Sequence, residues 1–329
     1  MSGFKDIVGH KQTIEHLRHA MESGKISHAY LIQGAAGSGK MLLAETFAAA
    51  LQCENGKDDV CGTCHSCRQA AGHNHPDIIY LTHEKPKSIS VKEIREQLVD
   101  DVSIRPYNGK YKIYIVAEAE KMTDGAQNAL LKTLEEPPAY AVILLLTENA
   151  AMLRETIHSR CVTLNLKPVP DNEVKKYLME HLEIPDYQAD ICVAFAQGSI
   201  GKAVSLASSE EFHAIKASAM QLLNNVRQME VSELIPAIKN IVQYKISVND
   251  YLDILAVWFR DVLYFKATRD VDGIIFRDEF KSIRNNASIS SYEGLETILA
   301  AIQKAKIRLD ANVNFELTME LLFLTIKEN

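Results

Sequence analysis

The chain has 329 residues, of which 47% are hydrophobic and 24% are charged, so its composition is that of a folded globular protein. This length predicts two or three domains with cores that need no disulfide bonds. The 36 basic and 43 acidic side chains leave a net charge of −7, which argues against a chain that binds nucleic acid strongly by itself. No apolar run reaches the roughly 18 residues of a membrane-spanning helix, and no apolar leader opens the sequence, so we expect a cytoplasmic protein.

The first half of the sequence alternates short apolar runs with stretches of helical periodicity. The expected strands begin near Ala29, Asp77, Lys112, Ala141 and Val162, and the expected helices cover 41–51, 91–99 and 124–135. Each strand is apolar throughout rather than at every second residue, which is typical of a parallel sheet covered on both faces. The alternation therefore predicts a doubly wound α/β layer.

The strand pattern stops after residues 167–170. Short helical stretches follow to about residue 208, and amphipathic helices fill the rest of the chain. We therefore predict an α/β domain over 1–166, a small helical domain over 167–208 and an all-helical domain over 209–329. The apolar stripe along 251–266 fits either a domain core or a surface that covers a partner, and the sequence leaves both open.

A glycine-rich sequence follows the first expected strand. Its pattern is G-x-x-x-x-G-K, with a strand before it and a helix after it, and its expected binding residues are Gly34, Gly37, Gly39 and Lys40. Glycines let the backbone fold around a phosphate, while the N–H groups and the lysine supply positive potential. The pattern predicts a phosphate loop for ATP or ADP.

The side chains that would hold Mg²⁺ beside this loop are missing. Met41 stands where Ser or Thr would offer a hydroxyl, and a thioether is a poor ligand for a hard cation. Ala117 stands at the end of the third strand, where an Asp would help to hold the metal, although Glu118 remains at the place of a catalytic base. Solvated carboxylates at a helix start explain Glu118 and Glu120 at least as well as catalysis. We expect poor hydrolysis, and nucleotide binding stays open.

Four of the six cysteines lie close together in the sequence, at Cys53, Cys61, Cys64 and Cys67. In a cytosolic chain such crowding favours metal over disulfides. Four thiolates satisfy tetrahedral Zn²⁺ and leave no coordination position open, so we predict a structural zinc module over 53–67. Ligand type alone leaves an iron–sulfur cluster as an alternative.

Several segments together resemble the AAA+ subunits of DNA polymerase clamp loaders. The most specific are Asn128–Pro138, with the sequence NALLKTLEEPP, and Ser159–Cys161, with the sequence SRC. Phe4–Lys11, Ser27–Leu31 and the degenerate phosphate loop agree with them. The resemblance covers essentially the whole chain and implies an AAA+ nucleotide-binding fold, a helical lid and a helical collar that holds the subunits together.

The resemblance also implies partners. Such a chain joins tau/gamma and delta subunits in a pentamer that opens a ring-shaped sliding clamp and places it on primed DNA. Members of the family carry a similar zinc module after the helix that follows the phosphate loop, which is where the module of this chain lies.

Three family positions bear on catalysis. The family's Ser-Arg-Cys arginine contacts ATP bound to the neighbouring subunit, so Arg160 is the expected arginine finger in trans, although alone it would be an ordinary surface arginine. Thr147 matches a residue that senses the terminal phosphate, but its hydroxyl would equally cap the following turn. Gly201 replaces an arginine that contacts nucleotide in active members. Together with Met41 and Ala117, it indicates a subunit that lends an arginine but does not hydrolyse ATP.

Two other functions remain in competition. One is an active clamp-loader ATPase of the tau/gamma type, in which Glu118 or Glu120 binds Mg²⁺ in a shifted register. The other is a zinc-dependent nucleic-acid-binding module, against which the acidic balance counts. The basic side chains at 110–112 and at Arg154 could approach DNA within the assembly. Isolated basic side chains are usually solvated, however, and we expect that of these.

Overall fold

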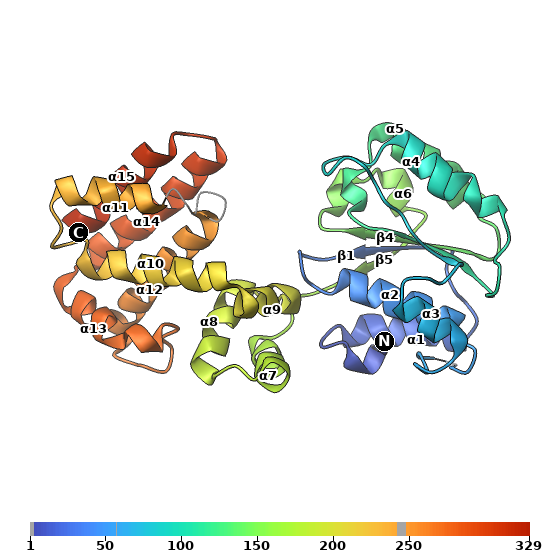
Figure 1. The fold of residues 1–329 in the computed structure, drawn as a ribbon, viewed down its shortest axis with the longest axis horizontal. Helices are drawn as coiled ribbons and strands as arrows, with labels where there is room; N and C mark the ends of the chain where they lie inside the picture. Colours follow the sequence, from blue (N-terminus) through green and yellow to red (C-terminus); the bar gives the residue numbers. More distant parts are fainter. Residues whose placement is uncertain (1–2, 57, 242–247) are drawn as a thin grey trace. The chain divides into compact units, whose positions relative to one another are not determined.

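The structure is a computed structural model that describes residues 3–56, 58–241 and 248–329. These residues form two compact units. The first unit extends to residue 177 and also contains 197–202, and the second contains 178–196 and the residues from 203 onward. In Figure 1 the strands belong to the blue and green part of the chain, and the yellow to red part is helical.

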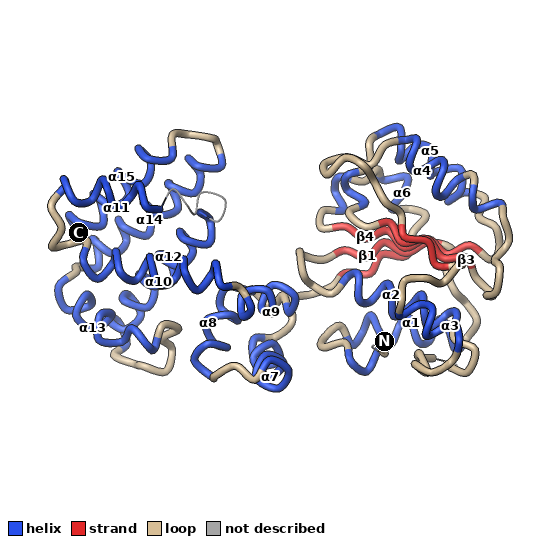
Figure 2. The backbone as a smooth tube through the Cα atoms, viewed as in Figure 1, coloured by secondary structure: helices blue, strands red, loops and turns tan. Residues whose placement is uncertain are grey.

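A parallel sheet forms the centre of the first unit and is drawn in red in Figure 2. The strand order is β2-β3-β4-β1-β5. Leu31 of β1 lies opposite Leu145 of β4 and Thr163 of β5, and all paired strands run in the same direction. The strands are β1 (Ala29–Gln33), β2 (Ile78–Tyr80), β3 (Lys112–Val116), β4 (Ala141–Thr147) and β5 (Val162–Asn165).

Helices cover both faces of this sheet, with α1 to α3 on one face and α4 to α6 on the other (Figure 1). Successive side chains of a strand point to opposite faces. Tyr30 and Ile32 therefore join one core cluster, and Leu31 joins the other. The helices are α1 (Lys11–Glu22), α2 (Lys40–Gln52), α3 (His65–Ala71), α4 (Val91–Ile94), α5 (Asp124–Glu135) and α6 (Glu155–His158), with a π-helical turn at Arg95–Val99 and 3₁₀ turns at Phe4–Asp6, Asp101–Ser103, Ala119–Lys121 and Ala150–Met152.

Local sequence signals fix the ends of α5, the helix with the NALLKTLEEPP sequence. The side chain of Thr123 accepts a hydrogen bond from the N–H of Ala126, which satisfies one free donor of the first turn. The helix ends at Glu135, just before Pro137, which cannot donate to a continuing helix. The predicted helix over 124–135 is confirmed.

Among its described residues, the second unit contains helices joined by loops and no strand. Its core contains large aromatic side chains, among them Tyr251, Trp258 and Phe323, each at most 1% exposed. None of the helices in the described part of the chain combines the length and apolar character that a membrane crossing requires. The remaining helices are α7 (Asp171–Leu182), α8 (Asp186–Ala196), α9 (Ile200–Ser208), α10 (Glu210–Asn225), α11 (Val231–Ile241), α12 (Val248–Thr268), α13 (Phe280–Ile289), α14 (Tyr292–Asp310) and α15 (Phe315–Glu328), with a 3₁₀ turn at Arg277–Glu279.

The predicted fold class is confirmed, with a parallel five-stranded sheet followed by helices. One expectation about a surface residue is wrong. Lys112 was expected to be solvated, yet it is only 5% exposed. Its ammonium lies 2.7 Å from a carboxylate oxygen of Asp101 and donates to the carbonyl oxygens of Asp101 and Ile104, so its charge is fully partnered inside the unit.

Candidate nucleotide and metal sites

The predicted phosphate loop, residues 34–40, lies between β1 and α2. Gly37 and Gly39 have φ angles of 69° and 89°, a region in which any side chain is strained. The Lys40 ammonium donates to the carbonyl oxygens of Gly34 at 2.7 Å and Ala35 at 2.8 Å. The lysine is therefore held against the backbone of its own loop.

The start of α2 offers backbone donors to an anion. The first hydrogen bond into this helix runs from the N–H of Leu43 to the carbonyl of Gly39 at 2.9 Å. Within the described residues, the N–H groups of Gly39, Lys40 and Met41 have no backbone acceptor. Free N–H groups at a helix N-terminus attract a phosphate, so the backbone half of a nucleotide site is present.

Two positions where the sequence analysis expects magnesium ligands carry no oxygen in their side chains. Met41 and Ala117 occupy the two positions where Mg²⁺ would find oxygen, and neither side chain carries any. Glu118 forms an ion pair with Lys121 at 2.7 Å and lies 3.4 Å from His83. The hydrogen bond from Lys121 is the main reason that the pKa of Glu118 is lowered. A general base works best with a pKa near the operating pH, so this pairing makes Glu118 a weak base.

Thr147 lies at the end of β4 next to the phosphate loop. Its side chain is fully buried, and its hydroxyl accepts a hydrogen bond from the N–H of Asn149 at 3.1 Å. Its carbonyl accepts one from the N–H of Gly34 at 3.1 Å. The hydroxyl therefore caps the following turn, which is one of the two roles left open by the sequence, and the backbone joins β4 to the loop.

Arg160 follows α6 and keeps 33% of its side chain exposed. One terminal nitrogen donates to Glu135 of α5 at 2.7 Å, and the other donates to the carbonyl of Thr156 at 3.0 Å and to the hydroxyl of Ser159 at 3.2 Å. Both sequence motifs of the resemblance, NALLKTLEEPP and SRC, therefore meet at this side chain. The contacts hold the guanidinium while part of the Arg160 side chain stays exposed.

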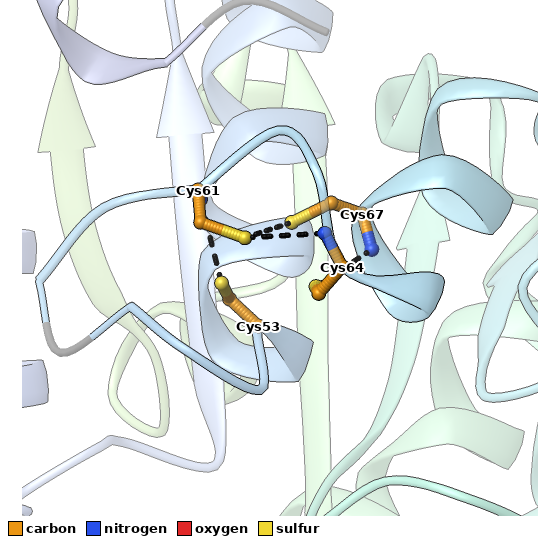
Figure 3. Close-up of side chains that lie close together, drawn as sticks. All are labelled: Cys53, Cys61, Cys64 and Cys67. Carbon is orange, nitrogen blue, oxygen red and sulfur yellow. Dashed lines mark hydrogen bonds between the residues drawn. The ribbon is translucent and has the colours of Figure 1, made fainter.

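The four clustered cysteines converge in space (Figure 3), and their sulfur atoms all lie within 4.8 Å of one another. Cys53 ends α2, and Cys64 caps α3. The sulfurs of Cys61 and Cys67 are 3.9 Å apart. Four sulfurs at 2.3 Å from a tetrahedral Zn²⁺ would be about 3.8 Å apart, so the donor set and its spacing fit zinc.

Backbone N–H groups point at these sulfurs. The N–H groups of Gly56, Cys64 and Cys67 donate to the sulfurs of Cys53, Cys61 and Cys64 at 3.1, 3.4 and 3.3 Å, respectively. Backbone hydrogen bonds from Thr63 and Cys64 lower the pKa of Cys61 to about 5, whereas burial raises the pKa of Cys67 to about 12. A bound cation would favour the thiolate form of all four ligands.

Two side chains that the sequence analysis did not assign contact the phosphate loop. His10 lies with its Nε2 atom 2.9 Å from the carbonyl oxygen of Ser38, and the hydroxyl of Ser199 donates to the carbonyl oxygen of Ala36 at 2.9 Å. The N–H of Gly201 donates to the carbonyl oxygen of Gly37 at 3.0 Å. His10 lies within the segment Phe4–Lys11 of the resemblance, but neither residue type by itself indicates a contact with the loop.

The sequence of this chain is similar to those of known protein families and of individual proteins. Residues 9–170 match the family described as "DNA polymerase III, delta subunit", and residues 210–328 match "DNA polymerase III, delta subunit, C terminal". The chain is 30% identical to DNA polymerase III subunit delta' of Bacillus subtilis (strain 168), over 95% of this chain and 94% of that protein. The first family match contains the phosphate loop, the four clustered cysteines and Arg160.

Two further relatives extend the comparison. The chain is 34% identical to DNA polymerase III subunit tau/gamma of Haemophilus influenzae, over 68% of this chain but only 32% of that longer protein. It is also similar to the structure of a DNA polymerase III gamma subunit-related protein from Thermotoga maritima, with 21% identity, a TM-score of 0.48, and 96% of this chain and 98% of that chain covered.

Proposed function

This chain belongs to the delta-prime family of DNA polymerase III clamp-loader subunits, and on that premise we propose that it is a non-catalytic subunit of the loader. It lends Arg160 to the ATP bound in a neighbouring tau/gamma subunit while the complex loads a sliding clamp on primed DNA. Tau/gamma and delta are its direct partners, and clamp and DNA are reached through the assembly. We place this activity in the cytoplasm.

One observation carries the proposal that the chain does not hydrolyse ATP. The backbone of the phosphate loop is formed, yet Met41 and Ala117 offer no oxygen to a magnesium ion. In phosphoryl transfer the metal bridges the phosphate oxygens and neutralises the developing charge. Glu118, the remaining candidate base, is further weakened as a base by its ion pair with Lys121.

The environment of Arg160 supports the finger role. A guanidinium presents a planar fork of donors that matches phosphate oxygens, whose negative charge grows in the transition state. Glu135 and Ser159 accept hydrogen bonds from this fork, and a third of the Arg160 side chain stays exposed. Positioning the charge beforehand removes the cost of ordering a long side chain during the reaction.

The rest of the chain fits a supporting role in the same complex. We propose that 1–166 form the AAA+ domain, 167–208 the lid and 209–329 the collar. The cysteines would hold one structural Zn²⁺ between the end of α2 and the start of α3. All four ligands are protein thiols, so such an ion would contribute stability rather than bind substrate.

A specific observation favours a second candidate, an active ATPase of the tau/gamma type. One carboxylate oxygen of Glu120 is buried and, among the described residues, has no hydrogen-bond partner. Such an atom would gain from a metal ion, as a shifted magnesium site requires.

ATP turnover separates the two functions. The isolated chain should release no phosphate above background, and adding it to tau/gamma and delta should raise the turnover of the loader. Turnover by the isolated chain that is lost in Lys40→Ala would instead establish the active ATPase. Failure of the chain to co-purify with tau/gamma and delta would contradict both clamp-loader functions.

A further inference from the structure

A short segment of the first unit, residues 198–202, contacts the phosphate loop directly. We call it the latch segment. It begins at Gly198, whose φ of 79° allows the chain to turn, and whose carbonyl accepts a hydrogen bond from the N–H of Val169 at 2.9 Å. A side chain at Gly198 would lie 2.6 Å from Pro168 and 2.8 Å from the carbonyl oxygen of Val169. The segment is therefore fixed to the chain that leaves β5.

Two hydrogen bonds connect the latch segment with adjacent loop carbonyls. The Ser199 hydroxyl donates to the oxygen of Ala36, and the N–H of Gly201 donates to the oxygen of Gly37. Ser199 is only 4% exposed, and its hydroxyl also accepts the N–H of Lys202 at 3.2 Å, which caps the start of α9. Its hydrogen-bonding capacity thus serves both its own helix and the loop.

Two glycines make this close contact possible. A Cβ atom at Gly201 would lie 2.7 Å from the carbonyl oxygen and 2.9 Å from the Cα atom of Gly37. A Cβ atom at Gly37 would lie 2.7 Å from the Ser199 hydroxyl and 2.8 Å from the backbone nitrogen of Lys202. Most of these neighbours are backbone atoms, which cannot move aside as the end of a flexible side chain can. Any larger residue at position 201 would push the two segments apart.

Other residues of the first unit bond to the remaining loop carbonyls. The His10 ring lies against the carbonyl of Ser38, and Lys40 bonds to Gly34 and Ala35. Five consecutive carbonyl oxygens, those of residues 34–38, thus have partners from the protein itself. The carbonyl groups of these five residues are therefore satisfied without any bound molecule.

We propose that residues 198–202 are a built-in latch that keeps the phosphate loop in one conformation whether or not nucleotide is present. The contact then requires glycine at position 201. This requirement explains why the chain lacks the nucleotide-contacting arginine that active family members carry at that position. In a chain built this way the loop does not open and close against this segment. The proposal concerns the loop alone and is independent of Arg160.

Hydrogen exchange of the full-length chain tests the latch. The informative amides are those of Ser38, which bonds to Ala35 at 3.1 Å, and of Gly201. In Ser199→Ala we expect both to exchange about fivefold faster, as the loss of one neutral hydrogen bond implies. In Gly201→Ala we expect an acceleration of about tenfold or more, because the backbone contact itself must open.

A matched glycine provides the control. Gly125 lies in α5. Outside its own helix, the one described residue that a Cβ atom there would meet is Val91, at 3.6 Å, so Gly125→Ala should leave both amides unchanged. If Ser199 only caps α9, Ser199→Ala will accelerate the first turn of that helix but not Ser38, and the latch is refuted. Should Gly201→Ala fail to fold, Ser199→Ala alone decides between these outcomes.

Discussion

Arg160 is a charged side chain that the protein holds in place but does not bury. We expect Arg160→Ala to leave the assembly of the loader intact and to reduce ATP turnover at the adjacent site by about 10³-fold or more, the size of the effect in other phosphoryl-transfer enzymes. The total ATP turnover of the complex should fall by the fraction that this one site contributes. Steady-state phosphate release by the reconstituted complex, with assembly checked by gel filtration, measures both.

Two variants control this experiment. Arg154→Ala removes another exposed arginine of the same unit, which pairs with Asp124 at 3.0 Å, and should not alter turnover. Arg160→Lys keeps the charge but loses the planar fork, so it should recover only part of the rate. Equal turnover by Arg160→Ala and the unmodified complex would remove the finger from the proposed function.

Residue types and spacing predicted the chemistry that single residues can perform better than they predicted the contacts that these residues make. The lack of a side-chain oxygen at Met41 and Ala117 is visible in the sequence, and its consequence for magnesium binding stays a prediction. The contact between Ser199 and Ala36 joins positions 163 residues apart, and nothing in either residue type announces it. Lys112 was wrongly expected at the surface because its partner, Asp101, lies on a turn that the strand pattern does not describe.

At the scale of an element, the cysteine loop should depend on its metal. Elemental analysis of carefully purified protein should find about one zinc per chain. Loss of a residue that supports a metal ligand lowers metal affinity roughly 10- to 100-fold. Cys64→Ser removes a ligand itself, so its zinc affinity should fall by more than this. Competition with a chromogenic chelator gives the affinity. Cys192→Ser, which changes a buried cysteine of the other unit, should retain full zinc content.

Other metal contents would contradict this assignment. Iron with inorganic sulfide would point to a cluster, and protein that lacks any metal while its fold is intact would show that the thiols pack without an ion. The spacing of the cysteines made the ligand set predictable. The backbone N–H groups that point at the sulfurs depend on the turns between the ligands, which the sequence does not specify.

A buried carboxylate supports the loop before β3. Asp77 is 1% exposed and accepts hydrogen bonds from the N–H groups of Tyr107, Asn108 and Gly109 at 2.5, 2.8 and 2.8 Å. Burial opposes its ionisation, but the three donors outweigh burial, so its pKa is lowered from 3.8. We expect Asp77→Asn, which keeps only one acceptor oxygen, to reduce the free energy of unfolding by roughly 2 kcal/mol at neutral pH.

The pH dependence has a defined sign. Because the pKa of Asp77 is lower in the folded chain, its stabilisation is present above the unfolded value of 3.8 and is lost as the pH falls through the folded value. The difference between Asp77→Asn and the unmodified chain should therefore shrink below about pH 4. Urea unfolding followed by circular dichroism at several pH values tests this. Asp124→Asn, at a carboxylate that is 82% exposed, is the control, and a difference that persists undiminished in acid would exclude the ionised form.

The elements themselves were largely predictable because their signals are local. Strands buried on both faces are apolar throughout, and prolines mark the end of α5, so the sheet and this helix follow from the sequence. The loop held by Asp77 was not predictable, since its donors follow some thirty residues later. Local patterns specify the elements, whereas long-range hydrogen bonds fix the loops between them.

At the scale of the whole molecule, the helical unit has a candidate surface for neighbouring subunits. A groove of about 570 Å³ lies between α14 and α15, with Ala301, Lys304 and Leu321 in its lining. Leu321 in the lining is 44% exposed, and Leu317 of the same helix, which is not part of the lining, is 53% exposed. Small residues let another helix approach closely, and exposed leucines gain from being covered.

If this groove receives a helix of a partner in the collar, Leu321→Glu should weaken assembly with tau/gamma and delta by about tenfold or more, because the carboxylate would be buried without a partner. Analytical ultracentrifugation of the mixed subunits measures the loss, and a thermal melt identical to that of the unmodified chain shows that the fold is intact. Val271→Glu changes another apolar residue of the same unit, 41% exposed and outside the groove lining, and should assemble normally. Normal assembly by Leu321→Glu would move the collar contact to other helices and leave this groove a feature of the single subunit.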